Sequence, residues 1–384
     1  MNIFISAGEP SGDLHGSNLT KALLAQDPQS QLFGFGGDKM QQAGCKLIYP
    51  LADLAIMGLY KVLTSIPRLK KILQLAIDHF IQTKPDVLVL IDYPGFHWHL
   101  AAAAKKLGIP VIYYVPPQIW AWASWRVRKM RRLVDLVLCN FPFEEKWFSD
   151  NNVPAKLISH PYYDQILNQK LDETFVEEQR EKSGVVIALL PGSRNQEVAL
   201  NLNALVKGAK MIHQQHPQTR FLVAAFSETH KTIINNALRN QTIPIEVFVG
   251  KTPEIISLAY VCAAVSGSVS LELLAAKIPT AIIFQTSPFM SLVAHTLKAV
   301  PYITLVNLLA GKELFPERFG CTCPSKWISE QLGVWLKYPQ KRNDLVQELS
   351  TLKNSILFGG ASEKGAKEII QFIETKKAQA AIAA

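Results

Sequence analysis

The sequence predicts an α/β protein built from two doubly wound, Rossmann-like domains with parallel sheets. The chain has 384 residues, of which 48% are hydrophobic. A chain of this length exceeds what one ordinary hydrophobic core accommodates. In both halves, short apolar runs alternate with segments in which apolar residues recur at helical spacing. This alternation is typical of parallel sheets covered by helices. A charged and weakly periodic stretch, residues 171–183, separates the two series.

The individual elements follow from these runs. In the first half we expect strands at 3–7, 32–35, 87–91, 111–115 and 136–139, a helix near 14–25 and a long amphipathic segment over 54–81. In the second half we expect strands at 185–190, 221–224, 246–249, 263–266 and 280–284. The chain therefore divides into an N-terminal domain over 1–165, a C-terminal domain over 184–350 and a helical tail over 351–384 that packs back on the N-terminal domain, with the linker inside 161–183.

Charge and cysteine content restrict the environment and the partners. A net charge of +9 favours an anionic partner: nucleic acid, an anionic lipid surface or a phosphorylated small molecule. Five scattered cysteines and a first strand that begins at once, without a signal peptide, predict a reducing cytoplasm. The uncharged stretch 278–297 is interrupted by Pro279 and Pro288, so we interpret it as a strand, a loop and a helix rather than a membrane span.

The turn Gly192-Ser193-Arg194 joins a predicted strand to a predicted helix. Ser193 followed by Gln196 matches a capping box, which would leave spare backbone N–H groups at the positive end of the helix dipole. Arg194 adds a guanidinium suited to phosphate oxygens. The turn is thus a candidate anion site, although an ordinary helix cap with a solvated arginine fits the same residues equally well.

A second strand-to-helix turn repeats this pattern. Gly267 and Ser268 precede the helix, and Glu272 lies about one turn inside it, where its carboxylate could accept hydrogen bonds from a ribose diol. Two such turns on neighbouring strands indicate one nucleotide diphosphate. Asn307 adds an amide that could donate and accept at the same place.

Two acidic residues follow strands of the first half. Glu9 lies in a loop whose glycines allow close approach of a ligand; a solvated loop acid is the alternative. Asp92 ends an apolar strand, where partial desolvation raises its pKa and suits it to accept a proton from a sugar hydroxyl; a cap on the next helix is the alternative. The pair His97 and His99 has no third metal ligand at matching spacing, which favours packing.

Two basic, amphipathic segments suggest a lipid surface. A cluster of cations at 126–132 follows Trp120, Trp122 and Trp125, a combination that single-strand nucleic-acid binders also use. The segment 54–81 adds a second apolar face interleaved with lysine and arginine, and a core helix remains the usual explanation for one such face alone. The apolar residues that we expect to face a membrane or acyl chains are Leu59, Leu63, Ile66 and Leu69.

Several motifs in this order resemble the lipid-A-disaccharide synthase family. They are GEPSGD, GGDKMQQAGC, LAIMGLYKVL, IDYPGFHWHLA, VPPQIWAW, LPGSRNQEV, SGSVSLE and LVNLLAGKELFPE, between about Ile3 and Pro316. The resemblance implies a GT-B glycosyltransferase fold and a hexosyltransferase that joins UDP-2,3-diacylglucosamine to 2,3-diacylglucosamine 1-phosphate. The implied products are the β-1,6-linked disaccharide 1-phosphate and UDP. No metal and no cofactor is implied.

The resemblance also assigns residues and places. Glu9 and Asp92 match the family's catalytic acids, and Arg194, Glu272 and Asn307 match its donor site, to which we add Gly192, Ser193, Gly267 and Ser268. It implies an acceptor-binding, membrane-facing N-terminal domain and a UDP-sugar-binding C-terminal domain. The implied place is the cytoplasmic face of the inner membrane, with peripheral attachment to an anionic surface. The oligomeric state stays open, with a homodimer as one option.

The sequence departs from the family pattern at three positions. Gly95 and His97 replace an acid and an amide, and Ser159 replaces the glycine of Gly-His-Pro, so acceptor binding is the part that these changes affect.

Two other functions fit some of the same residues. A UDP-sugar 2-epimerase-like isomerase would need the same donor site, and a basic nucleic-acid-binding protein would use the Trp and Arg cluster but leave Asp92 and Glu9 without a task.

Overall fold

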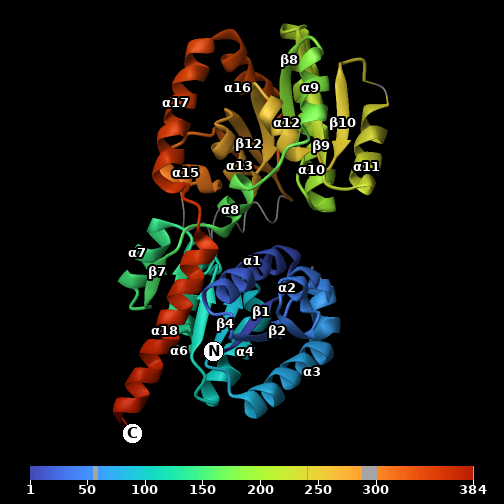
Figure 1. Cartoon of the computed structure of the whole chain (residues 1–384). Coiled ribbons are helices and arrows are strands. Elements are labelled where there is room, and N and C mark those ends of the chain that lie inside the picture. The colour runs from blue at the N-terminus through green and yellow to red at the C-terminus, as the bar shows by residue number, and fades with distance from the viewer. Residues whose placement is uncertain (55–58, 240, 288–300, 384) are drawn as a thin grey trace. The chain divides into compact units, whose positions relative to one another are not determined.

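The computed structural model describes the chain except residues 55–58, 240, 288–300 and 384. The chain forms two units (Figure 1), the first made of Met1–Leu167 and Phe358–Ala384, and the second of Asn168–Leu357. Each unit contains one parallel sheet with helices on both faces, which confirms the predicted fold class. The stretch 278–297 contains a strand at Thr280–Gln285, and its residues from 288 onward lie outside the described ones.

Unit 1 contains a seven-stranded sheet in the order β3-β2-β1-β4-β5-β6-β7. Its strands are β1 (Asn2–Ala7), β2 (Gln31–Phe35), β3 (Lys46–Tyr49), β4 (Val87–Ile91), β5 (Val111–Tyr114), β6 (Leu136–Cys139) and β7 (Ala155–Leu157). The five predicted strands are confirmed. The two strands that the sequence did not predict, β3 and β7, are the edge strands, and their residues are only partly buried.

The side chains of β4 show how this sheet is covered. Leu88 and Leu90 join one core with helices α3 (Leu59–Thr83), α4 (Pro94–Lys106), α6 (Val127–Leu133) and α7 (Pro142–Asp150). Val87, Val89 and Ile91 point to the other face, where α1 (Pro10–Gln26) and α18 (Ala361–Ala383) complete a second core. The shorter helices of the unit are α2 (Asp38–Gln42), η1 (Leu51–Leu54), α5 (Ile119–Trp122), η2 (Ser124–Arg126) and α8 (Pro161–Leu167).

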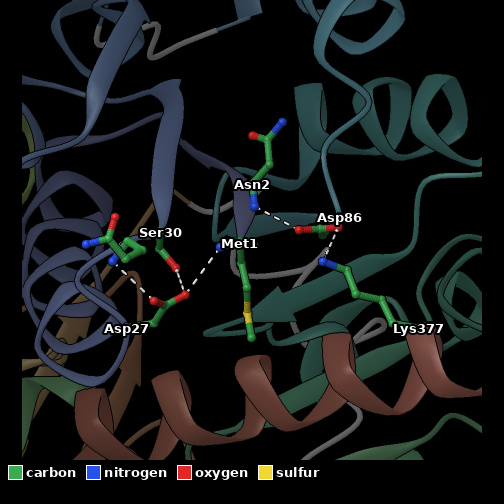
Figure 2. Close-up of polar contacts among 7 residues, drawn as sticks. Met1, Asn2, Asp27, Ser30, Asp86 and Lys377 are labelled. Carbon is green, nitrogen blue, oxygen red and sulfur yellow. Dashed lines mark hydrogen bonds and ion pairs between the residues drawn. The ribbon is translucent and has the colours of Figure 1, made fainter.

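The C-terminal helix α18 is part of unit 1 although it follows unit 2 in the sequence. Its apolar residues Ile369 and Ile373 are buried in this second core, and α18 packs against α1. Figure 2 shows a polar contact that accompanies this packing: Lys377 lies 2.8 Å from Asp86, whose other carboxylate oxygen accepts the N–H of Asn2 at 2.8 Å. Because exposed ion pairs contribute little, the buried apolar face holds α18 in place.

Unit 2 contains a six-stranded sheet in the order β10-β9-β8-β11-β12-β13. Its strands are β8 (Val185–Leu190), β9 (Thr219–Ala225), β10 (Ile245–Val249), β11 (Val261–Val265), β12 (Thr280–Gln285) and β13 (Glu317–Gly320). One face carries α10 (Asn195–Gln215), α11 (Glu228–Leu238) and α16 (Ser325–Lys337). The other carries α12 (Thr252–Leu258), α13 (Val269–Ala276), α15 (Leu305–Ala310) and α17 (Pro339–Ile356). The helix α9 (Glu173–Glu181) precedes β8. Of these strands only β13, at an edge, was not predicted.

Each sheet has one position where the strand order reverses. In unit 1 it lies between β1 and β4, where Ala7 pairs with Ile91. In unit 2 it lies between β8 and β11, where Leu190 pairs with Ala264. Ligands of open α/β sheets bind beyond the carboxyl ends of the strands at such reversals. The loops that follow these four strands are therefore the candidate ligand-binding loops.

Candidate active site

The reversal in unit 1 brings the loop after β1 beside the loop after β4. Glu9 is the N-cap of α1, and Asp92 directly follows β4. Asp92 and Tyr93 both adopt left-handed backbone conformations, with φ of 50° and 47°. The Tyr93 ring packs on Gly8 so closely that a Cβ at Gly8 would lie 2.2 Å from it. Consecutive left-handed residues other than glycine are strained, and such strain clusters at functional sites.

Neighbouring side chains hold the backbone of Asp92. Its carbonyl oxygen accepts hydrogen bonds from the hydroxyl of Tyr113 at 2.6 Å and from Nδ1 of His97 at 2.7 Å. A carbonyl only accepts, and burial lowers the pKa of His97 to about 4, so the ring is neutral with its proton on Nδ1. Nε2 of His97 therefore accepts from the hydroxyl of Ser6 at 2.9 Å. The peptide of Asp92 is thereby fixed from two sides.

The Asp92 carboxyl has a perturbed pKa. Burial, and secondly the negative charge of Glu9, raise its pKa from 3.8 to about 6, while the N–H of Tyr93 lowers it. A base with a pKa near the working pH accepts a proton without being permanently protonated. The alternative, that Asp92 caps α4, does not hold, because the N-cap of that helix is Tyr93.

The residues that depart from the family pattern have structural positions. His97 is fully buried, and a Cβ built at Gly95 meets no described atom within 4 Å. The hydroxyl of Ser159 donates to the carbonyl of Phe358 at 2.6 Å, at the start of the segment that leads into α18. His160 packs against Phe141, with ring centroids 5.2 Å apart, and burial lowers its pKa to about 3. The side chains of His97 and Ser159 thus form hydrogen bonds with other groups of the protein.

In unit 2, the turn after β8 differs in detail from the prediction. The N-cap of α10 is Arg194, and the residue three positions later is Glu197. The predicted capping box of Ser193 and Gln196 is therefore wrong by one residue. Gly192, with φ of 106°, makes the turn, and Ser193 and Arg194 are exposed.

The backbone donors of this turn are not spare, as the sequence had suggested. Oε2 of Glu197 accepts the N–H groups of Ser193 at 3.2 Å and Arg194 at 3.3 Å. Its Oε1 accepts from Nη1 of Arg194 at 2.8 Å. The turn thus already holds an anion, and that anion is a side chain of the protein.

The turn after β11 resembles the prediction closely. Ser268 is the N-cap of α13, and Glu272, half-buried, is the fourth residue of the helix. Gly267 and Ser268 are exposed, and a Cβ built at Gly267 meets no described atom within 4 Å. The hydroxyl of Ser266 donates to the carbonyl of Ile303 at 3.1 Å.

Asn307 has a different position from the one expected. It is fully buried, and its Oδ1 accepts the N–H groups of Leu314 and Phe315 at 2.8 and 2.9 Å. Its Nδ2 donates to the carbonyl of Phe315 at 2.7 Å and to Glu317 at 3.0 Å. The amide makes four bonds within unit 2 and so shapes the loop before β13. Glu317, which also accepts from the N–H of Thr304, was not singled out from the sequence, although it ends the motif LVNLLAGKELFPE.

The two basic segments differ in exposure. Trp120 is buried and donates to Glu144 at 3.0 Å, whereas Trp125 is 62% exposed beside exposed cations. On α3, Ile66 is 41% exposed, but Leu69 packs against the core of unit 1. The membrane-facing expectation therefore does not fit Leu69. Leu59 and Leu63 belong to the part of α3 whose side chains lie outside the described residues. None of the described helices combines the length and apolar content of a bilayer crossing.

Comparison with known proteins gives a family for the chain. The family model described as lipid-A-disaccharide synthetase matches residues 3–368. The lipid-A-disaccharide synthase of Syntrophus aciditrophicus is 34% identical over 382 residues, covering 97% of this chain and 98% of the relative. That of Geobacter metallireducens is 31% identical over 376 residues, covering 98% of both.

Solved structures share the fold at low sequence identity. UDP-GlcNAc 2-epimerase from Neisseria meningitidis, bound to UDP-GlcNAc, superposes with a TM-score of 0.65 at 13% identity, covering 97% of this chain and all of that one. The glycotransferase of kitacinnamycin gives 0.61 at 13%, covering 96% and 98%. The likeness to the epimerase extends to the fold alone, whereas the family match covers nearly the whole chain. The chain therefore belongs to the lipid-A-disaccharide synthetase family and is a disaccharide-forming glycosyltransferase of GT-B fold.

Proposed function

We propose that the chain transfers the sugar of UDP-2,3-diacylglucosamine to 2,3-diacylglucosamine 1-phosphate with inversion at the anomeric carbon. The observation that carries this proposal is the carboxyl of Asp92, raised in pKa to about 6 and fixed at the reversal of the unit 1 sheet. The products are the β-1,6-linked disaccharide 1-phosphate and UDP. The relatives named lipid-A-disaccharide synthase support the substrate pair.

In the proposed reaction, the 6-hydroxyl of the acceptor gives its proton to Asp92. The oxygen of this hydroxyl forms a bond to the anomeric carbon of the donor sugar, while the bond from that carbon to the diphosphate oxygen breaks. The leaving UDP takes the electron pair. Glu9 keeps the pKa of Asp92 high enough to hold that proton.

We assign donor binding to unit 2. Arg194 and the N-terminus of α13 would stabilise the charge that grows on the leaving diphosphate, since helix N-termini and guanidinium groups bind phosphate oxygens. Glu272 would accept from the ribose. Support comes from solved structures of similar fold that contain UDP, among them Anabaena HepE in complex with UDP and glucose, at a TM-score of 0.57. Asn307 and Glu317 would act indirectly by shaping the loop before β13.

The test is product formation by the purified chain. Incubation with the two acylated glucosamines, followed by mass spectrometry, is expected to yield the disaccharide and UDP. Asp92→Asn should reduce turnover about a hundredfold or more while leaving UDP affinity unchanged, because asparagine tolerates the left-handed backbone but accepts no proton. The matched control is Asp38→Asn, an exposed acid of the same unit. Near-normal turnover of Asp92→Asn would remove Asp92 as the base.

We also propose peripheral attachment to an anionic membrane, on the cytoplasmic face of the inner membrane. The net charge of +9 and the exposed Trp125 and Ile66 support it. Vesicles with anionic lipid should retain the chain in low salt and release it in high salt. The double variant Ile66→Gln and Trp125→Ala should bind them more weakly; unchanged binding of that variant would contradict this surface.

A further inference from the structure

We propose that Glu197 is an internal anion of the turn after β8, which occupies Arg194 in the free protein and yields it to UDP. The carboxylate then limits how tightly UDP is held and promotes its release. This inference rests on the proposed function, because it assumes that Arg194 binds the diphosphate. It assigns Glu197 a part in regulating the same site.

The contacts of Glu197 divide into a fixed part and an exchangeable part. Its Oε2 accepts two backbone N–H groups, of Ser193 and Arg194, and these bonds are part of the cap of α10. Its Oε1 accepts from the Arg194 guanidinium at 2.8 Å. Only the contact between Oε1 and the Arg194 guanidinium can be given up without disturbing the helix end.

Glycine at position 192 permits this arrangement. A Cβ at Gly192 would lie 2.7 Å from Oε2 and 2.8 Å from Cβ of Glu197, and the φ of 106° disfavours any other residue. The carboxylate therefore lies directly against the turn that the sequence marks as an anion site. A bound diphosphate at this turn would meet the negative charge of Glu197 at close range.

Exposure indicates which partner moves. The Glu197 side chain is 17% exposed, whereas that of Arg194 is 63% exposed. An ion pair whose guanidinium is largely exposed gains little free energy, so this guanidinium is readily lost to a stronger anion. A diphosphate offers more charge and more acceptor oxygens than one carboxylate. UDP should thus take over Arg194 while Glu197 stays on the backbone.

The consequence is a site that binds its leaving group with moderate affinity. Glu197 competes for Arg194 before binding and repels the diphosphate after binding. Both effects raise the Kd of UDP. A transferase that must release UDP in each cycle gains turnover from such a residue.

The test is Glu197→Gln, which removes the charge and keeps the cap, because glutamine at this position also accepts from the N-cap N–H. We expect calorimetry to give a Kd for UDP about fivefold or more below that of the wild type, with stronger product inhibition by UDP. The thermal midpoint should stay the same. The matched control is Glu330→Gln, which removes one carboxylate from the exposed pair of Lys326 and Glu330 in the same unit. It should leave the Kd unchanged.

Two outcomes would overturn the proposal separately. If Glu197→Gln binds UDP no more tightly than the wild type, while Arg194→Ala binds it more weakly, Glu197 only caps the helix or orients Arg194. If Arg194→Ala binds UDP as tightly as the wild type, the diphosphate does not bind at this turn, and the proposed donor site fails with it.

Discussion

Replacing Glu9 by glutamine removes one negative charge beside Asp92 while keeping the size of the side chain. In the wild type, the pKa of Asp92 is raised from 3.8 to about 6, with burial as the larger cause and Glu9 as the second. Because Glu9 is one cause of the rise, its removal should lower the pKa of Asp92, and burial remains as the larger cause. Burial keeps the remaining value above that of an ordinary aspartate.

The sign of the rate change follows from the role of the base. In its proposed role Asp92 accepts a proton only when ionised, so kcat/KM should rise with pH through the pKa of Asp92 and level off above it. A lower pKa moves this acid limb to lower pH. At about pH 5, Glu9→Gln should therefore retain a larger fraction of its own maximal kcat/KM than the wild type does.

The assay is kcat/KM for disaccharide formation across the acid range, with each variant normalised to its own plateau. Normalisation matters because Glu9 is itself a candidate catalytic residue, and its loss can lower the plateau. Asp38→Asn, with the same change of charge at an exposed position, is expected to keep the wild-type limb. An acid limb at the same pH in Glu9→Gln and the wild type would refute the coupling of Glu9 to Asp92.

Three further changes have expected outcomes. Arg194→Ala should reduce turnover about a hundredfold or more and weaken UDP binding in calorimetry, since a fixed contact to a charged transition state contributes about 2.7–4 kcal/mol. Gly8→Ala should lower the free energy of unfolding in urea by about 1–3 kcal/mol, because its Cβ would meet the Tyr93 ring at 2.2 Å. The pKa of buried His97 is lowered from 6.5 to about 4, so its contribution of about 3 kcal/mol is complete above pH 6.5 and is lost as the pH falls towards 4. His97→Gln should flatten that part of the stability profile in denaturant titrations.

The sequence predicted the central strands well because their signal is local. A fully buried strand such as β4 is a continuous apolar run, and the polar residue that ends it, Asp92, marks the carboxyl edge of the sheet. The strands that escaped prediction, β3, β7 and β13, are short and only partly buried. Their register depends on a neighbour rather than on their own residues.

The details of the site depended on information that is not local. Gln196 and Glu197 both match a capping box, and the choice between them changes when the helix begins one residue later. Asn307 looked available because its partners, Leu314 to Glu317, follow a loop whose path the sequence does not reveal. On α3, apolar residues recur at the same helical spacing whether the face that they form contacts lipid or the protein core. The sequence alone therefore does not distinguish the two kinds of face. Burial distinguishes Ile66 from Leu69.

Both candidate loops place a carboxylate beside the group that would do the chemistry. In unit 1, Glu9 raises the pKa of Asp92 and so makes it a stronger proton acceptor. In unit 2, Glu197 pairs with Arg194 and would so make it a weaker phosphate ligand. Opposite effects are what a transferase needs, since the acceptor hydroxyl must be activated firmly and the UDP must leave. The same kind of side chain would therefore favour the start of the reaction in one loop and its end in the other.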